Sequence, residues 1–280
     1  MDLLIENDFD KFQLSTLGVL VTDIVPDTPS IHSTRTSINF RNGKVWSGAV
    51  YDEKEITVTG YYYAFDEYAD QEMKDKLNFI FATTKPYYIA PMFSVDGLYE
   101  FERPGESNGE VYDEISQRQF EYKYRWHVIL SDVIDYEFQG ASTKGLLTKF
   151  TLNFVTADIP FGMSLPIDEV VTGQKQIIYT GTAAVSQLEW PFYFELVAGK
   201  NQSESFDIQL GKRTFKYNGV NSVKAGDVFE IRGTSFLLNG LSVNEYTNFE
   251  YFELNPGVNQ SFSTTFSGDI TLKNKVNFYI

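Results

Sequence analysis

Histidines are the first residues to examine for catalysis or metal binding, and the 280 residues contain only two, His32 and His127. A metal site or a catalytic triad that used both would require them to converge. They lie far apart in the sequence, in separate strand-like stretches. We expect His127 to be a half-buried strand residue beside Trp126 and His32 to lie at the surface. The histidines therefore predict neither a metal site nor a catalytic site.

Acidic side chains are abundant enough for glycoside hydrolysis, which needs two Asp or Glu about 5–10 Å apart. With 38 acidic residues, chance proximity is expected, so abundance alone indicates little. The clearest clusters, Asp66 with Glu67 and Glu250 with Glu253, are typical of a helix N-terminus and of a solvated strand face. Gly105–Gly109 lacks the Lys-Ser/Thr pair and the following helix of a phosphate-binding loop, and no stretch has the spacing of an EF-hand. The sequence predicts no catalytic, cofactor-binding or metal-binding residue, and no enzyme.

Aromatic side chains leave one binding chemistry open, the stacking of sugar rings. The candidates in the C-terminal half are Trp190, Tyr193, Tyr246 and Tyr251. The same residue types are enriched in protein cores and in protein–protein interfaces. Sugar-stacking rings should lie together on one open face, whereas core rings should alternate inward. The sequence assigns no binding residue between these alternatives.

Composition limits the possible partners. The formal net charge of −15 argues against binding to nucleic acid or to anionic membranes, both of which attract positive charge. The absence of cysteine excludes disulfides, thiolate catalysis and cysteine-ligated metals. The N-terminus has no secretory signal, and no apolar run reaches the roughly 20 residues of a membrane span. We expect a protein that is synthesised in the cytoplasm, with no specific nucleic-acid binding and no membrane insertion.

The segment Tyr68–Phe81 is the only one with sustained helical periodicity. Its apolar stripe consists of Ala69, Met73, Leu77, Ile80 and Phe81. The opposite face is predicted to carry Asp70, Lys74, Asp75 and Lys76. Asp66 suits the N-cap and the Lys85-Pro86 pair ends the element, so a helix is predicted over about residues 67–82. The stripe should pack on a sheet, because the surrounding sequence is strand-like.

The rest of the chain is predicted to form short strands in two parts. The aromatic content of 16% and alternating stretches such as Glu53–Tyr63 and Leu146–Val155 favour β structure. The acidic, Gly-containing stretch Ser94–Arg118 is predicted to be a long loop or protruding hairpin. Clustered Pro and Gly residues then mark a boundary. We predict a mainly β, α+β N-terminal domain with one helix over residues 1–162, a linker over 163–175, and a β-sandwich or jelly roll over 176–280.

Several stretches stand in an order that identifies a family. In the N-terminal part these are RNGKVWSGAVYDEKEITVTGYYY (Arg41–Tyr63), the helix, the KPYYI strand and the closing TLNFVTADIPFG. In the C-terminal part these are IIYTGTAAV, the strand at Trp190-Pro191, VKAGDVFEI, SFLLNG and FEYFELNPGVNQSF. This order resembles the distal tail proteins of siphophages that infect Gram-positive bacteria, the hub family of the tail tip or baseplate. Ser94–Arg118 matches no motif of that family.

The resemblance implies a structural virion protein of the phage tail. The N-terminal domain would assemble with itself into a ring, usually hexameric, around a channel for DNA. The C-terminal domain would be a galectin-like β-sandwich that attaches other components. The partners implied are the tail tube protein and tail-tip proteins, such as a tail-associated lysin or receptor-binding proteins. The acidic excess suits a conduit that must not bind passing DNA. The alternatives are a carbohydrate-binding module and, more distantly, a glycoside hydrolase.

Overall fold

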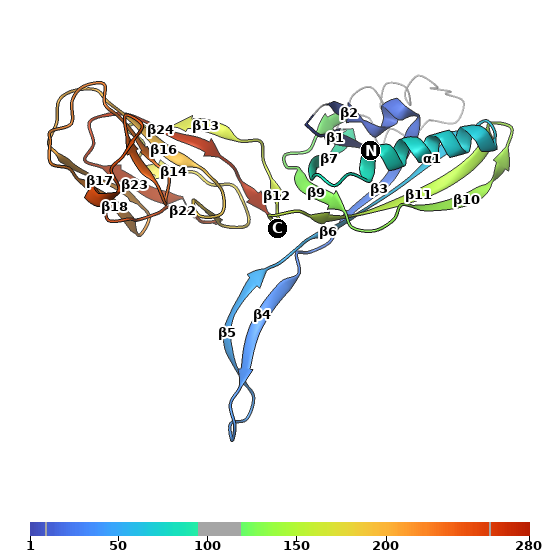
Figure 1. Ribbon diagram of the computed structural model, residues 1–280, viewed down its shortest axis with the longest axis horizontal. Coiled ribbons are helices and arrows are strands. Elements are labelled where there is room, and N and C mark those ends of the chain that lie inside the picture. Colours follow the sequence, from blue (N-terminus) through green and yellow to red (C-terminus); the bar gives the residue numbers. More distant parts are fainter. Residues whose placement is uncertain (9, 95–118, 258) are drawn as a thin grey trace, which may run out of the picture. The chain divides into compact units, whose positions relative to one another are not determined.

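The computed structural model describes residues 1–8, 10–94, 119–257 and 259–280. The chain divides into two compact units, Met1–Gly162 together with Ile280, and Met163–Tyr279. Most of the described residues that are in regular structure form strands, and α1 (Glu67–Phe81) is the only α-helix among them (Figure 1). The predicted fold class, mainly β with one helix, is confirmed. No helix in the described part of the chain is long and apolar enough to cross a membrane.

The first unit is built on one antiparallel sheet in the order β2-β1-β7-β9-β11-β6-β3, with β8 paired to β7 and β10 paired to β11. A 3-10 turn, η1 (Leu14–Leu17), joins β2 to β3. The strands are β1 (Asp2–Glu6), β2 (Lys11–Gln13), β3 (Val19–Pro26), β6 (Glu55–Ala64), β7 (Tyr87–Ser94), β8 (Gln119–Glu121), β9 (Trp126–Leu130), β10 (Asp135–Ser142) and β11 (Gly145–Thr156).

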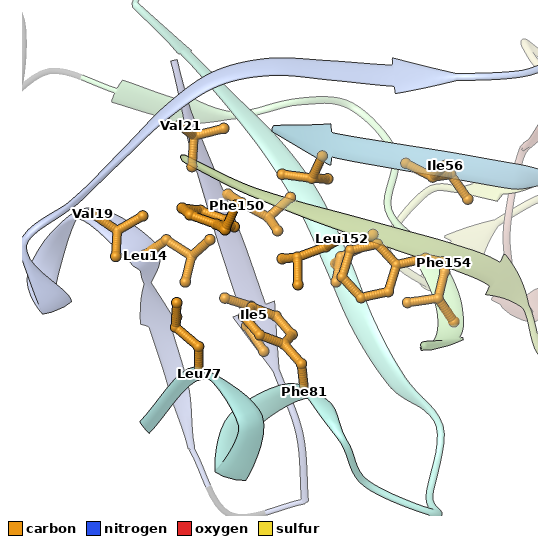
Figure 2. Packing of buried hydrophobic residues seen from close by; sticks show 14 of the residues in the cluster. Ile5, Leu14, Val19, Val21, Ile56, Leu77, Phe81, Phe150, Leu152 and Phe154 are labelled. Atoms are coloured by element: carbon orange, nitrogen blue, oxygen red, sulfur yellow. The ribbon is translucent and has the colours of Figure 1, made fainter. Parts of the chain in front are cut away.

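Strict alternation along β6 and β11 gives the sheet its buried face. Every second residue is buried along β6 and along β11 from Thr148 onward, because successive side chains of a strand point to opposite faces. Helix α1 lies over that face, and Figure 2 shows Leu77 and Phe81 directed from the helix into the hydrophobic cluster, with Leu77 toward Leu14. Leu77 and Phe81 are fully buried, while Met73 packs at the margin of the cluster. The predicted apolar stripe of the helix and its packing on a sheet are confirmed.

The ends of α1 follow from local chemistry. Asp66 has extended backbone, and its side chain accepts a hydrogen bond of 2.8 Å from the backbone N–H of Ala69, which is the N-cap interaction predicted from the sequence. The helix ends at Phe81, one residue before the predicted limit, with Ala82 as its C-cap. Lys85 and Pro86 then lead into β7, so the chain reverses within a few residues.

The prediction that Asp70 lies on the solvent face of α1 is wrong. Its side chain is only 15% exposed, and its Oδ1 accepts hydrogen bonds from the Tyr62 hydroxyl at 2.9 Å and the Thr148 hydroxyl at 2.8 Å. The other oxygen lies 2.7 Å from Nζ of Lys74. Asp70 precedes Met73 and Leu77 by three and seven residues, so it shares their face of the helix. The hydroxyl of Thr148 on β11 donates a hydrogen bond to the Asp70 carboxylate, which offsets part of the cost of burying it.

This buried network gives the first unit a specific pH dependence. Burial raises the pKa of Asp70, but hydrogen bonds from Lys74, Thr148 and Tyr62 outweigh it, so the pKa is lowered overall. A carboxylate with a lowered folded-state pKa stabilises the fold above its unfolded pKa of about 3.9, and this contribution is lost as the pH falls through the lower folded value.

We expect Asp70→Asn to destabilise the first unit by about 1–3 kcal/mol at pH 7, because the amide N–H₂ would face the Lys74 ammonium. The stability difference from the native chain should shrink below about pH 4, where the native carboxylate becomes protonated. Urea unfolding at pH 7 and pH 3 measures both effects. Asp75→Asn is the matched control, because Asp75 is exposed on the same helix and binds only Gln71. Equal stability of the two variants would contradict the role of Asp70.

The second unit is a β-sandwich of two antiparallel sheets. The six-stranded sheet has the order β13-β24-β16-β19-β20-β21, and the four-stranded sheet has the order β14-β23-β17-β18. The strands are β12 (Gly162–Met163), β13 (Ile167–Val170), β14 (Gln176–Ile177), β15 (Val185–Ser186), β16 (Tyr193–Ala198), β17 (Ser205–Leu210), β18 (Arg213–Asn218), β19 (Val228–Ile231), β20 (Phe236–Leu238), β21 (Leu241–Ser242), β22 (Glu253–Leu254), β23 (Gln260–Thr264), β24 (Gly268–Lys275) and β25 (Phe278–Tyr279).

Aromatic contacts join the two sheets of this sandwich. Phe194 of β16 stacks on Phe262 of β23 with ring centroids 5.8 Å apart. Phe206 of β17 meets Phe229 of β19 edge to face at 4.9 Å. Each pair crosses from one sheet to the other, so the inner faces form a single core. The short 3-10 turn η2 (Asn244–Tyr246) is the one helical departure from an all-strand second unit in the described residues.

Residues 163–175 are part of the second unit, whereas the sequence predicts a linker there. β13 pairs with β24, and Lys275 Nζ lies 2.6 Å from Glu169. The pattern was missed because this edge strand is exposed along most of its length and so shows no alternation. The predicted loop Ser94–Arg118 begins at the end of β7, and its residues 95–118 lie outside the described part of the chain.

Candidate assembly surface

The two histidines stand apart in the structure. His32 is exposed on β4, and His127 is half-buried on β9 next to Trp126, as predicted. The His127 ring stacks on Tyr88 with centroids 4.6 Å apart, and its Nδ1 lies 3.2 Å from an Asp158 oxygen. Among the described residues, no group of three side chains is arranged to hold a metal ion.

The acidic clusters have structural roles. Asp66 and Glu67 form the N-terminus of α1, as predicted. Glu250 and Glu253 both bind Arg213, with N–O distances of 2.7 and 2.9 Å. They are about as buried as the arginine itself, so the predicted solvated strand face is instead an ion-pair cluster.

The four aromatic candidates for sugar stacking are each half-buried. The Tyr193 ring has the Arg232 guanidinium 3.9 Å from its centroid, and the Tyr251 ring has that of Arg213 at 4.0 Å. Trp190 donates its indole N–H to the Asn274 carbonyl and meets Phe278 edge to face. Three of the four side chains are therefore engaged inside the second unit, which does not favour a stacking platform.

A β-hairpin of the first unit has no core of its own. We call it the arm: β4 (Ile31–Ser37), the turn, and β5 (Lys44–Tyr51). β4 and β5 pair only with each other among the described strands, and none of residues 31–51 is buried. The arm continues the β3–β6 pair, since Asp27 and Ser30 N–H groups bond to carbonyls of the facing chain (Figure 1). An isolated two-stranded hairpin is marginal in water, so the arm is suited to pairing with another surface.

The arm presents apolar side chains to solvent. Trp46 is 66% exposed, and Phe40 at the turn is fully exposed with a backbone φ of 65°. A left-handed backbone at a bulky residue is unfavourable, so the fold holds this ring outward at a conformational cost. The remaining large apolar residues exposed on the arm are Ile31, Ile38, Val50 and Tyr51. Large exposed apolar side chains concentrated on one element are a feature of interaction sites.

The arm also differs in charge from the rest of the chain. It carries Arg35, Arg41 and Lys44, and none of the 38 Asp and Glu residues falls within residues 31–51. The whole chain has a net charge of −15 and the arm a charge of +3, so the rest of the chain has a net charge of −18. A cationic, apolar element on an acidic body is complementary to another copy of that body.

The sheet of the first unit has long unpaired edges at β3 and β10, in addition to the short strand β2 at its other end. Strands β10, β11, β6 and β3 lie side by side in that order. Among the described residues, the outer edges of β3 and β10 face no strand. Unpaired N–H and C=O groups along a strand are a template for pairing with another chain. Both edges are long, so the sheet can be extended at either side.

The face of this four-strand segment opposite α1 carries polar and acidic side chains among apolar ones such as Leu20 and Tyr61. Cross-strand pairs share a face, and one row across the strands consists of Asp135, Thr151, Thr59 and Asp23. In the adjacent row, the Thr57 hydroxyl donates to Asn153 at 3.1 Å. The charged residues of this face are Asp23, Glu55, Asp135, Glu137 and Lys149. We call it the open face, and its carboxylates outnumber its lysine.

Free edges at β3 and β10, carboxylates on the open face and a cationic arm with exposed apolar side chains are features suited to contacts with other chains. The comparisons with known proteins agree. The family described as phage tail protein RIFT-related domain matches residues 7–156, more than half of the chain. The chain belongs to this family of phage tail proteins, a structural family, as expected from the absence of a predicted active site.

One solved structure has a similar fold over nearly the whole chain. The Dit protein of phage SPP1, described as a paradigm of the hub adsorption apparatus in phages infecting Gram-positive bacteria, has a TM-score of 0.66 at 15% identity, covering 99% of each chain. A structure of the phage P2 baseplate in its activated conformation with calcium has a TM-score of 0.36 at 10% identity, covering 98% of each chain. Its strontium form gives 0.37 at 9% identity, covering 99% of this chain and 96% of that chain. No curated protein matches the chain.

Sequence reasoning predicted the class of protein but did not single out the arm or the free strand edges. The Asn42-Gly43 turn signal lies in the arm, yet nothing in the local sequence shows that β4 and β5 lack other partners. The absence of Asp and Glu over residues 31–51 of an acidic chain was the one signal that could have identified the arm.

Proposed function

We propose that this chain is the hub subunit of a phage tail and that its first unit closes into a ring, of six copies as the family resemblance implies. The carrying observation is the pair of free edges, β3 and β10, on opposite sides of one four-strand segment. An interface between two different surfaces of identical subunits forms a ring when the rotation closes. Closure also removes edges that would otherwise promote aggregation.

The arm supports this assembly. It is cationic and apolar, whereas every acidic residue of the chain lies outside it. Reaching across to an adjacent copy would bury its exposed rings and place its cations near carboxylates. Pairing of β3 of one copy with β10 of the next, which we call the seam, would set the register between neighbouring copies. The arm would add contact area beyond the seam.

The open face would line a central channel for DNA. It carries Asp23, Glu55, Asp135 and Glu137 against one lysine, so a ring would repeat an acidic lining in every subunit. Such a surface repels the phosphate backbone and lets DNA pass without binding. No specific nucleic-acid binding is part of this proposal.

The second unit would attach other tail components, namely the tail tube protein or tail-tip proteins such as a lysin or receptor-binding proteins. It exposes large apolar side chains at its surface: Val220, Leu241 and Phe249 are 74%, 74% and 60% exposed. The chain would be synthesised in the host cytoplasm and act in the virion tail. The division of labour between a ring-forming first unit and an attaching second unit is part of the proposal.

Negative-stain electron microscopy with light-scattering mass measurement tests the ring. At high concentration, with purified tail tube protein added where the chain alone stays monomeric, we expect closed rings with a central hole and a mass near six copies. Asp23→Lys combined with Asp135→Lys should retain rings yet make them bind DNA in a salt-sensitive way, since the lining would become cationic. Monomers under all conditions, including with the tube protein, would contradict the proposal.

A further inference from the structure

A small aromatic cavity lies beside the free edge of β3. Its volume is about 330 Å³. The lining residues are Ile24, Pro26, Pro91, Phe93, Tyr122, Tyr124 and Trp126. Ile24 and Pro26 belong to the last residues of β3, so the cavity opens next to the proposed seam between subunits.

Trp126, which lines the cavity, and Lys54, which lies beside the Trp126 ring, both carry donors that have no acceptor among the described residues. The indole N–H of Trp126 is buried and has no hydrogen-bond partner. Lys54 is 4% exposed, and its Nζ lies 6.0 Å from the centre of the Trp126 ring. No carboxylate of the described residues forms an ion pair with Lys54, and Asp27 acts on it only at longer range. A buried indole N–H and the ammonium of a mostly buried lysine are costly when unpaired, so this corner favours an incoming acceptor with negative charge.

Burial lowers the pKa of Lys54, and Asp27 offsets this only in part. The amine is therefore poorly solvated in a single chain, because desolvation disfavours its charged form. A carboxylate that arrived with a partner would stabilise the charged form of the amine and oppose this lowering of its pKa. This agrees with the geometry of the cavity.

The strand register shows which part of another copy would arrive there. Ser131, which follows β9, donates its N–H and hydroxyl to the Asn153 carbonyl, both at 2.9 Å. Asn153 pairs with Thr57, and Thr57 pairs with Val25. The β9–β10 loop and the β3 residues beside the cavity are thus the two ends of one row across the sheet. Rotation about the ring axis leaves the position of every residue along that axis unchanged. If the strands run along the axis, a row crosses the subunit at one position along it, so one end of the row in one copy lies next to the other end of the row in the adjacent copy.

We propose that the β9–β10 loop of one copy docks into this cavity of the next copy, with Val133 in the aromatic cavity and the Asp132 carboxylate toward Lys54. This inference rests on the proposed ring. Val133 is 78% exposed, so its side chain is available to a neighbouring copy, whereas the adjacent Ile134 packs against the core of its own unit. Asp132 Oδ1 accepts the Val133 N–H at 2.7 Å, which holds the carboxylate beside the valine and leaves its second oxygen for the incoming amine.

Disulfide trapping tests the contact directly, since the chain contains no cysteine. Ile24→Cys and Val133→Cys are prepared as two separate single variants and mixed under ring-forming conditions with a mild oxidant. A mixed disulfide between them can form only between different molecules. We expect a covalent dimer containing one of each variant, seen on a non-reducing gel and by mass spectrometry, and little dimer from either variant alone.

A control pair separates this contact from the ring itself. Leu20 and Glu137 end another row of the same strands, on the open face, and are 62% and 63% exposed, the latter figure for the side chain. Leu20→Cys and Glu137→Cys should also crosslink if β3 and β10 form the seam. Crosslinking of the control pair alone would overturn the docking of Val133 and leave the ring intact. Failure of both pairs would overturn the docking and also the seam on which the ring proposal rests.

The charge contact has its own measurement. Lys54→Met and Asp132→Asn should each raise the concentration needed for half-maximal assembly by about tenfold or more, because each leaves a partner unpaired at the interface. Their combination should cost little more than either alone. The melting temperature of the Lys54→Met monomer should not fall. Lys76→Met, at an exposed helix position, controls for the loss of a charge. Unchanged or fully additive assembly would exclude the Lys54–Asp132 contact.

Discussion

Leu77→Asp is expected to abolish the folded first unit. Leu77 is fully buried where α1 meets the sheet, in contact with the cluster around Phe154 (Figure 2). Removing the leucine side chain from such a site costs about 2–5 kcal/mol. A buried, unpaired carboxylate adds several kcal/mol on the usual scale. The sum approaches the whole stability of a typical domain, about 5–15 kcal/mol.

Circular dichroism and a thermal melt measure this effect. Phe79→Asp is the matched control, because Phe79 lies on the same helix but is 87% exposed, so its loss of apolar area and gain of charge occur in solvent. Met73→Asp should fall between the two, since Met73 packs only at the margin of the cluster. A soluble Leu77→Asp protein with an unchanged melting temperature would show that the packed face of α1 has been assigned wrongly.

Periodicity predicted the elements whose partners are local. The stripe of α1 and the alternation of β6 and β11 are repeated patterns, and burial in the structure follows them. Asp70 is an exception, because a charged residue is expected to face solvent. Here its carboxylate is largely buried and is bound by Thr148, Tyr62 and Lys74. Such compensation comes from residues distant in sequence, so no local window contains it.

The assembly surface was not predictable for a related reason. An edge exists only because of which strands fail to pair, and β3 and β10 become edges through the long-range order of the whole sheet. Exposed apolar residues in the arm look like core residues in the sequence, because alternation says nothing about whether a second layer covers them. The strand β13 was missed for the opposite reason, since it is ordered but exposed.

Removing the arm is expected to abolish ring formation without unfolding the chain. Residues 34–48 can be replaced by Asn-Gly, which suits a tight turn between the paired residues Ser33 and Ala49. None of the deleted residues is buried, so the melting temperature of the first unit should be nearly unchanged. The deletion removes Phe40, Trp46 and all three cations of the arm. Light scattering and electron microscopy should then show monomers at concentrations where the full chain forms rings.

A second variant distinguishes the charge of the arm from its apolar surface. Reversing Arg35, Arg41 and Lys44 to glutamate keeps the hairpin and its exposed rings. If attraction to the acidic body of the next copy drives docking, this variant should assemble as poorly as the deletion, and its defect should diminish as salt screens the repulsion. If apolar burial dominates, the reversed arm should assemble nearly normally at all salt concentrations. Rings formed by the truncated chain at the same concentration as the full chain would remove the arm from the mechanism and leave closure to the edges of β3 and β10 alone.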